Sequence, residues 1–394
     1  MANQNLTPTM VTREALRILH QKLNFIGNID RQHDASFGRD GAKIGDTLKV
    51  RLPNEYTVRT GTAISVQDNI ETSVDLVVAT QKGVDVEFTS AELTLDIDTF
   101  GSRILDPMMS VLAASIENDA LSMYKDVYNQ VDNIGSAITF VKVLEGRKQL
   151  IDNLAGSANL KTNLTTQDNV DLVDVLKGLF QDSTQIAKQY RDGMVGRTAG
   201  FEFFENTLMP RHATGTSATT TGYLVDGVSQ TGSTLAVDTG TTTFLKGDII
   251  TIAGVNRVHP ETKVDTGQLQ TFVVTSDSGA SATSLAISPA ITTTGGKQNV
   301  TGSPADNAAI SKQGGASASH DVSLSYAKDA FTFATADLRM PSGVDFAARE
   351  IMDGISMRIV SDYDITTDKF PTRVDVLYGY KAQRPQLATR LANN

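Results

Sequence analysis

The stretch from residue 213 to residue 320 differs sharply in composition from the rest of the chain. Only twelve of its 108 residues are charged, against 20% of the whole chain, and Thr, Ser and Gly dominate it. Helical periodicity is absent, and short apolar runs alternate with turn-rich segments. The predicted strands are residues 233–238, 248–255, 271–275 and 284–287. We therefore expect a small all-β domain inserted into a larger domain.

The segment before residue 90 combines a helix with widely spaced strands. Residues 12–25 have apolar side chains at helical spacing, which predicts an amphipathic arm that ends at Gly27. From residue 45 the period changes to two, and strands are predicted around Val50, Leu76 and Val86. Residues 53–72 have few side chains able to fill a core, so they predict a long projecting hairpin or loop.

Residues 103–131 give the strongest helical pattern in the chain. Their apolar stripe predicts a helix of about 40 Å, with Pro107 in its first turns, where proline is tolerated best. Shorter helices are predicted at residues 139–154 and 170–190, separated by a polar stretch.

Strand-like alternation returns after the insertion. It is found at residues 330–334, 356–363 and 373–378, and the chain then closes with a polar tail. The segments outside the insertion together predict one α+β domain.

Charge and cysteine content exclude several classes of protein. The 35 basic and 45 acidic residues give a net charge of −10, and no basic block occurs, so a dedicated nucleic-acid reader is not expected. The chain has no cysteine, which suits a protein made in a reducing cytoplasm. No segment has the roughly 20 consecutive apolar residues that a membrane span needs, so we expect a soluble protein.

No group of residues forms a recognisable chemical site. The five histidines have neither H-x-H nor H-x-x-x-H spacing, and we expect them to be solvated or in loops. Glu92, Asp96 and Asp98 could ligate a divalent cation, which leaves a metal-dependent hydrolase open as an alternative, although helix-start acids are the favoured reading. We expect no catalytic, cofactor-binding or metal-binding residues and no enzyme activity.

The order of these parts resembles the Hong Kong 97-type fold of tailed-bacteriophage major capsid proteins. Within that group, the sequence is similar to the coat proteins of short-tailed phages that carry an inserted β-barrel domain. The resemblance covers nearly the whole chain and depends on the shared order of its motifs. They are TREAL at 12–16, GAKIGDT at 41–47, YTVRTG at 56–61, YRDG at 190–193, AGF at 199–201, LKGDI at 245–249, AGV at 253–255, YG at 378–379 and RP at 384–385.

The resemblance implies a division of the chain into six parts. They are an N-terminal arm at 1–42, an extended loop with flanking strands at 43–90, a peripheral domain with a long spine helix at 91–137, the first part of an axial domain at 138–222, the inserted β domain at 223–319, and the remainder of the axial and peripheral domains at 320–394.

The resemblance also implies a function and its partners. A coat protein of this kind would assemble with itself into pentamers and hexamers of an icosahedral shell, with scaffolding and portal proteins taking part. The shell would form in the bacterial host cytoplasm and enclose double-stranded DNA without reading its sequence. Another phage structural protein, from the tail tube or a decoration, is the first alternative, but it would not be expected to contain the long helix.

A projecting loop needs a neighbour to bury it, which places the candidate intersubunit contacts within residues 51–59. The candidates are Arg51, Glu55, Tyr56 and Arg59.

Overall fold

The computed structural model describes residues 8–34, 47–59, 61–64, 66–68, 71–89, 104–176, 196–366 and 369–394. The chain divides into two compact units, each built from separate stretches of sequence. Unit 1 comprises residues 1–50, 73–121 and 331–383, and unit 2 comprises residues 51–72, 122–330 and 384–394. Both units mix helices with sheet, which confirms the α+β class, but the single domain predicted for the segments outside the insertion is divided between the two units.

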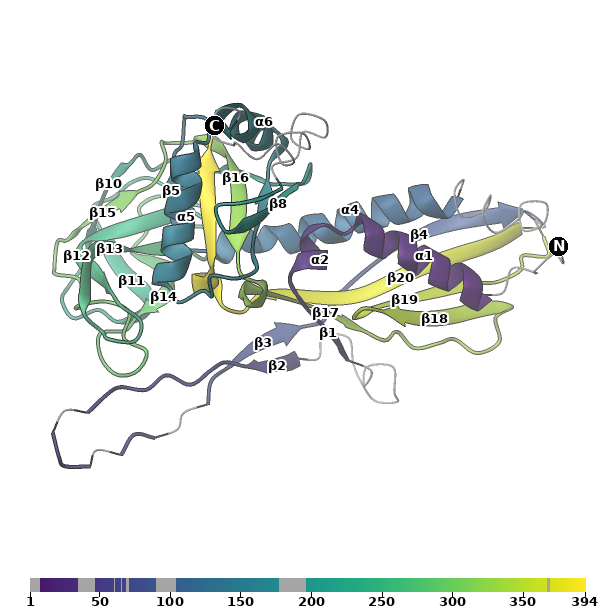
Figure 1. Cartoon of the computed structure of the whole chain (residues 1–394), viewed down its shortest axis with the longest axis horizontal. Helices are drawn as coiled ribbons and strands as arrows, with labels where there is room; N and C mark the ends of the chain where they lie inside the picture. The colour runs from purple at the N-terminus through teal and green to yellow at the C-terminus, as the bar shows by residue number, and fades with distance from the viewer. Residues whose placement is uncertain are drawn as a thin grey trace. The chain divides into compact units, whose positions relative to one another are not determined.

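Unit 1 contains a six-stranded sheet with the strand order β1-β17-β20-β19-β18, in which β4 also pairs with β20. The strands β2 and β3 form a separate pair. Figure 1 shows α1 and α4 as the two long helices that accompany the long strand β20. The elements are α1 (Pro8–Lys22), α2 (Phe25–Asn28), β1 (Asp30–Asp34), β2 (Thr47–Arg51), β3 (Ser73–Val77), β4 (Thr80–Thr89), α4 (Asp106–Leu121), β17 (Phe331–Ala336), β18 (Phe346–Met352), β19 (Ile355–Ser361) and β20 (Lys369–Ala382).

The amphipathic helix near the N-terminus is confirmed. In α1, Val11, Ala15 and Leu19 recur at the spacing of one helix face and are buried. That face packs against α4 and β18 within unit 1. The short helix α2 then begins beside the buried Glu117 of α4, whose carboxylate accepts hydrogen bonds from the backbone amides of Asn24 and Phe25 at 2.7 and 2.8 Å.

The long helix predicted over residues 103–131 is wrong in its second half. The α-helix ends at Leu121 and is followed by the 3₁₀ helix η4 (Ser122–Asp126) and the strand β5 (Gln130–Asp132). Val127 and Val131 are buried all the same. The apolar stripe therefore continues through a change of secondary structure, because both the helix and the strand after it are covered.

Unit 2 contains a seven-stranded sheet with the order β5-β21-β16-β6-β8-β7, in which β9 also pairs with β16. It also contains a closed six-stranded barrel with the order β10-β11-β14-β13-β12-β15. The remaining elements are α5 (Phe140–Asp152), β6 (Leu160–Leu164), α6 (Thr166–Leu176), β7 (Arg197–Thr198), β8 (Phe201–Glu205), β9 (Arg211–Ala213), β10 (Thr220–Val225), β11 (Gly232–Asp238), β12 (Ile249–Val258), β13 (Asp265–Val274), β14 (Ser284–Ile291), β15 (Ala309–Lys312), β16 (Ser319–Tyr326), η5 (Lys328–Ala330), η6 (Pro385–Leu387) and β21 (Ala388–Asn393).

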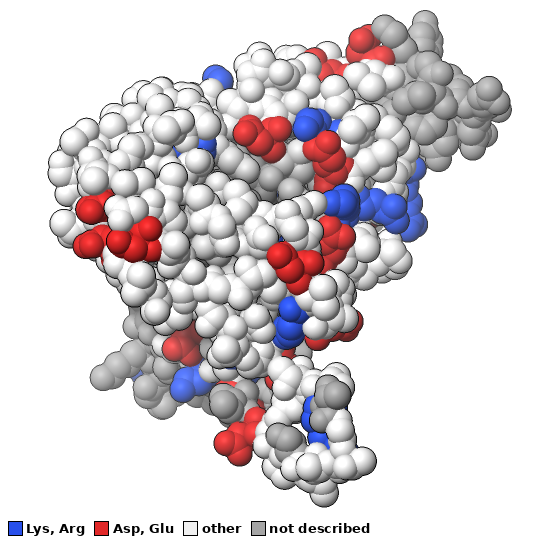
Figure 2. Space-filling model, turned by 90° about the vertical axis from the view of Figure 1, so that its left-hand side faces the viewer, with Lys and Arg blue, Asp and Glu red and all other residues white. Residues whose placement is uncertain are grey.

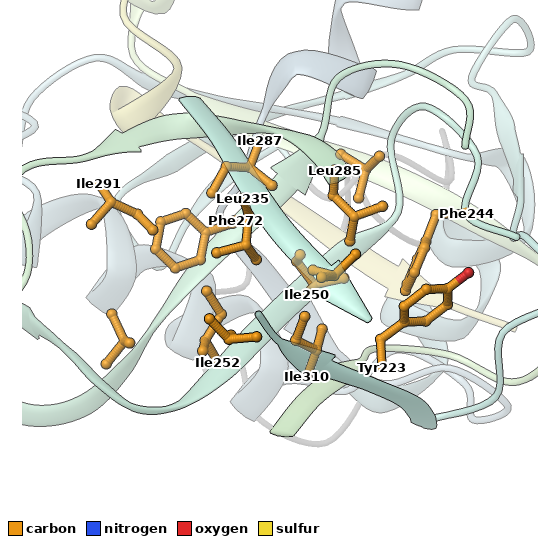
Figure 3. Close-up of a cluster of buried hydrophobic side chains, with 14 of the residues drawn as sticks. Tyr223, Leu235, Phe244, Ile250, Ile252, Phe272, Leu285, Ile287, Ile291 and Ile310 are labelled. Carbon is orange, nitrogen blue, oxygen red and sulfur yellow. The ribbon is translucent and has the colours of Figure 1, made fainter. Parts of the chain in front are cut away.

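The closed barrel confirms the β structure expected from the composition break. Alternate residues of its strands point inward and form one cluster of buried apolar side chains, shown in Figure 3. Phe272 and Ile250 from neighbouring strands lie in this cluster, and Tyr223 and Phe244 close one end of it. The interior is filled with side chains, so the barrel is a packed core.

The polar tail expected after residue 378 is also wrong. The last strand, β21, lies in the seven-stranded sheet between the parallel β5 and the antiparallel β16, and every one of its residues is buried. Two of its polar side chains donate hydrogen bonds inside unit 2. Asn393 Nδ2 donates to Asp168 Oδ2 at 3.1 Å, and Arg390 donates to the Gly247 carbonyl at 2.9 Å.

Candidate functional site

The loop between β2 and β3 comprises residues 52–72 and belongs to unit 2. Its base is closed by the Leu52 amide, which donates to the Thr72 carbonyl at 2.8 Å. Farther out, the Gln67 side chain accepts from the Thr57 amide at 2.9 Å and donates back to the Thr57 carbonyl. These bonds join the two legs of the loop and place Thr57 opposite Gln67.

One face of this loop is apolar and open to solvent. Side chains alternate between the two faces of an extended chain, so the neighbours of Thr57 and Gln67 share the face opposite to that pair. Tyr56, Val58 and Val66 lie on it beside the charged Asp68, and they are 57%, 94% and 87% exposed. Ile64, two residues before Val66, is 83% exposed. Four large apolar side chains with this exposure form a surface that a partner could cover.

The structure places the four predicted contact residues along one leg of the loop. Arg51 pairs with Glu71 across the base at 3.2 Å, and Arg59 donates to the carbonyls of Gly61 and Ala63 at the tip. Both arginines therefore hold the loop itself together. Tyr56 belongs to the apolar face, and Glu55 is exposed beside it.

No metal site is found among the residues that the structure describes. The three acids of the hydrolase alternative, Glu92, Asp96 and Asp98, lie outside the described residues.

The chain enters and leaves the barrel through one pair of strands, which we call the neck. It consists of β9 and the residues of β16 that pair with it, Ser319–Asp321, and it places His212 directly opposite His320. The two rings lie edge to face with centroids 5.4 Å apart. Both histidines are buried, so the expectation that they are solvated is wrong for this pair.

Hydrogen bonds link the neck to the barrel and to η4. His212 Nε2 lies 3.1 Å from Asp248 Oδ1, and His212 Nδ1 lies 3.1 Å from the Tyr124 hydroxyl. Because a carboxylate can only accept, Nε2 carries the proton and Nδ1 accepts from Tyr124. Asp248 also accepts from the amides of Gly215 and Leu245 at 3.0 Å.

Burial keeps the neck histidines neutral. It lowers the pKa of His320 to about 3 and also lowers the pKa of His212, although the hydrogen bond to Asp248 opposes the second shift. Burial alone would raise the pKa of Asp248, but the hydrogen bonds from His212 and two backbone amides outweigh it and lower that pKa.

The positive groups beside the neck are buried as well. Burial lowers the pKa of Arg390 to about 10, and its guanidinium lies 5.9 Å from the centre of the Tyr124 ring. Lys312, whose pKa burial also lowers, donates to the carbonyls of Gly215 and Gly315 at 3.1 Å.

This buried arrangement links η4, the neck and the barrel. Sequence reasoning missed it because His212 and His320 are 108 residues apart. A signal was nevertheless present, since the two histidines flank the composition break, and the ends of an inserted domain must lie close together in the host.

Charges on the barrel side of the molecule are mixed. Figure 2 shows Lys and Arg scattered next to Asp and Glu, with broad uncharged areas between them and no continuous basic surface among the described residues of that face. Within the described ranges, no helix is both long and apolar enough to cross a membrane.

Comparison with known proteins identifies the family. The model of the P22 coat protein family, gene protein 5, matches residues 90–390. No curated protein matches this chain.

Among solved structures, the chain is similar to that of Mycobacterium phage Che8, with 11% identity, coverage of 91% of this chain and 88% of that one, and a TM-score of 0.45. It is also similar to a chain of the mature capsid of bacteriophage PhiM1, with 10% identity, coverage of 94% of this chain and 87% of that one, and a TM-score of 0.46. The CUS-3 coat protein I-domain is 31% identical, with coverage of 25% of this chain and 93% of that domain and a TM-score of 0.18. Because the family model matches about three quarters of its length, this chain belongs to the P22 coat protein family and is a major capsid protein, a structural subunit of a bacteriophage shell.

Proposed function

We propose that this capsid protein has the Hong Kong 97-type arrangement and forms the pentamers and hexamers of an icosahedral shell. The N-terminal arm would be residues 1–42, the extended loop 43–90, the peripheral domain 91–137, and the axial domain 138–222, completed with the peripheral domain by 320–394. Residues 223–319 would be the inserted domain. The order of helix, projecting loop, long helix, mixed sheet and closed barrel supports this division.

The partners follow from the same proposal. Assembly would take place in the host cytoplasm with scaffolding and portal proteins, and the shell would enclose double-stranded DNA. The net charge of −10 favours a wall that does not hold DNA tightly, because tight binding to phosphates needs clustered Lys and Arg.

One observation carries the proposed mode of assembly: the exposed apolar face of the loop. Tyr56, Val58, Ile64 and Val66 would cost free energy in an isolated subunit, because each leaves most of its apolar surface in water. We propose that a second copy of this chain covers this face. Arg51, Glu55 and Arg59 would lie at its edge, where they orient the loop and contribute about 1 kcal/mol or less as ion pairs.

Removal of residues 54–72 tests this assignment. The deletion should leave a folded subunit, because none of the segment's described side chains is buried, and it should abolish normal shells. Circular dichroism reports the fold, and sedimentation with electron microscopy reports the shells.

A milder variant separates loss of the contact from loss of the loop. Val58→Ser/Val66→Ser removes apolar surface from the face, and Val228→Ser removes an exposed valine from the barrel as the matched control. We expect assembly to be impaired only in the loop variant. Shells of normal yield and shape from both the deletion and the double variant would refute the role of the loop.

A further inference from the structure

The turn between β14 and β15 is held rigidly by hydrogen bonds. Asn299 links its two sides, since its side chain accepts from the Thr292 amide at 2.9 Å and donates to the Ala290 carbonyl at 2.8 Å. Lys263, in the neighbouring β12–β13 turn, donates to the carbonyls of Gly296 and Gln298. The tip of this turn therefore cannot move without breaking several bonds.

The rigid turn lies against the base of the projecting loop. A Cβ atom at Gly296 would be 2.5 Å from the Glu55 carbonyl oxygen and 2.9 Å from the Glu55 carbonyl carbon. Both are closer than side-chain atoms can approach a backbone, so Gly296 allows the barrel and loop backbones to meet. All of these residues belong to unit 2.

We propose that residues 292–300 of the barrel form a seat that sets the direction of the loop, with Gly296 as the positioning residue. Contact at Glu55 lies one residue before the apolar face, so a displacement there carries Tyr56 and Val58 with it. The inserted domain would thus act in assembly by aiming a contact element of its own subunit. The effect of the loop direction on shell formation depends on the assembly role proposed above for the loop. The contact between residues 292–300 and the loop does not depend on that role.

The substitution Gly296→Ala should displace the loop and leave the barrel intact. The added methyl group meets backbone atoms, which cannot rotate away, and the hydrogen-bonded turn resists movement. The side with fewer bonds, the loop, is the one that moves. Gly279→Ala and Gly302→Ala are matched controls, because a Cβ atom at either position meets nothing within 4 Å.

Two spin labels on the unassembled full-length subunit measure the direction of the loop. The chain has no cysteine, so Val58→Cys and Val228→Cys provide unique labelling sites on the loop and the barrel, and both positions are exposed. Electron–electron double resonance should give a narrow distance distribution in the parent protein and in both controls. Gly296→Ala should shift or widen it, with thermal unfolding unchanged.

Lys263→Met provides a second variant if Gly296→Ala does not fold. It removes the bonds to Gly296 and Gln298, and the looser turn should widen the same distribution. A distribution that Gly296→Ala or Lys263→Met leaves unchanged overturns the seat. A displaced loop in subunits that still build normal shells supports the seat and instead counts against the loop as an assembly contact.

Discussion

Replacement of His320 by Phe should remove much of the acid sensitivity of unit 2. His320 is buried in the neck with a pKa of about 3, and neither of its ring nitrogens has a hydrogen-bond partner among the described residues. The groups that act on it electrostatically are His212, Arg390, Asp248 and Lys312. A proton on His320 would therefore be buried close to two cations, with one carboxylate to balance them.

The magnitude follows from linkage. In the unfolded chain, histidine titrates near pH 6.5, so below that pH the unfolded state takes up a proton that the folded state excludes until about pH 3. Stability is complete above pH 6.5 and falls as the pH is lowered. The slope approaches about 1.4 kcal/mol per pH unit, and the loss between pH 6.5 and 4.5 is about 2 kcal/mol for this residue. His212, whose pKa is also lowered, adds a loss of the same sign.

Urea unfolding of the full-length subunit at pH 7.0 and pH 4.5, followed by circular dichroism, measures the effect. At pH 7.0, His320→Phe should unfold within about 1 kcal/mol of the parent protein, because an apolar ring of similar shape replaces one that makes no hydrogen bond. At pH 4.5, the variant should be the more stable of the two by about 2 kcal/mol. Carboxylates that begin to titrate near pH 4.5 change the stability of both proteins equally, so their contribution cancels in the difference between the two. An equal loss of stability in both proteins would refute the reasoning.

Two further substitutions test the packing of each unit. Phe272→Ala should destabilise the barrel by about 3–5 kcal/mol, because the side chain is fully buried. We expect residues 223–319 expressed alone to give dispersed amide signals in a proton NMR spectrum, and the same substitution in this fragment should abolish them. Tyr378→Phe should destabilise unit 1 by about 1–3 kcal/mol in urea unfolding, because the Tyr378 hydroxyl donates to Asp119 Oδ2 at 2.6 Å. An unchanged urea midpoint would show that Lys82, whose Nζ lies 2.7 Å from the same oxygen, is a sufficient partner for the Asp119 carboxylate.

The sequence predicted elements where the pattern of burial is local. Alternating apolar residues in 233–238 and 284–287 correctly indicated β11 and β14, which pair with each other in the barrel. The composition break correctly indicated a β structure in this segment, where a closed barrel is found, because few charges and many turn residues suit short strands around a small core. These signals need no knowledge of distant partners.

The sequence failed where a distant partner decides the outcome. Arg390 and Asn393 suggest a polar tail, yet both are buried, and the acceptors of their hydrogen bonds, Gly247 and Asp168, are far away in the sequence. The apolar pattern predicts a helix that continues past Leu121, where the α-helix ends. Val127 and Val131 fit the pattern because they are buried, but they lie outside the helix. Apolar periodicity reports burial and only indirectly the backbone that provides it.

The loop at residues 52–72 is predicted for a third reason, the shortage of core-forming residues between two predicted strands, and its described residues are largely exposed. The sequence could place Arg51 and Arg59 in that loop, but it could not show that both bind within it. Those contacts depend on the turn geometry at the tip and on the register of the two legs.

The barrel is inserted between two paired strands of the seven-stranded sheet, β9 and β16, which form the neck. The two chain segments leave that sheet as directly opposed residues of an antiparallel pair, where Cα atoms lie about 4.5–5.5 Å apart. An ordinary hairpin turn spans the same distance between paired strands. The register of the host sheet is therefore the same whether two residues or about a hundred connect β9 to β16. A change in the length of the barrel's distal turns therefore leaves the pairing of the host sheet unchanged. Exchange of the whole barrel would be different, because it would remove the partners that Asp248 and Gly247 provide for His212 and Arg390 of the host.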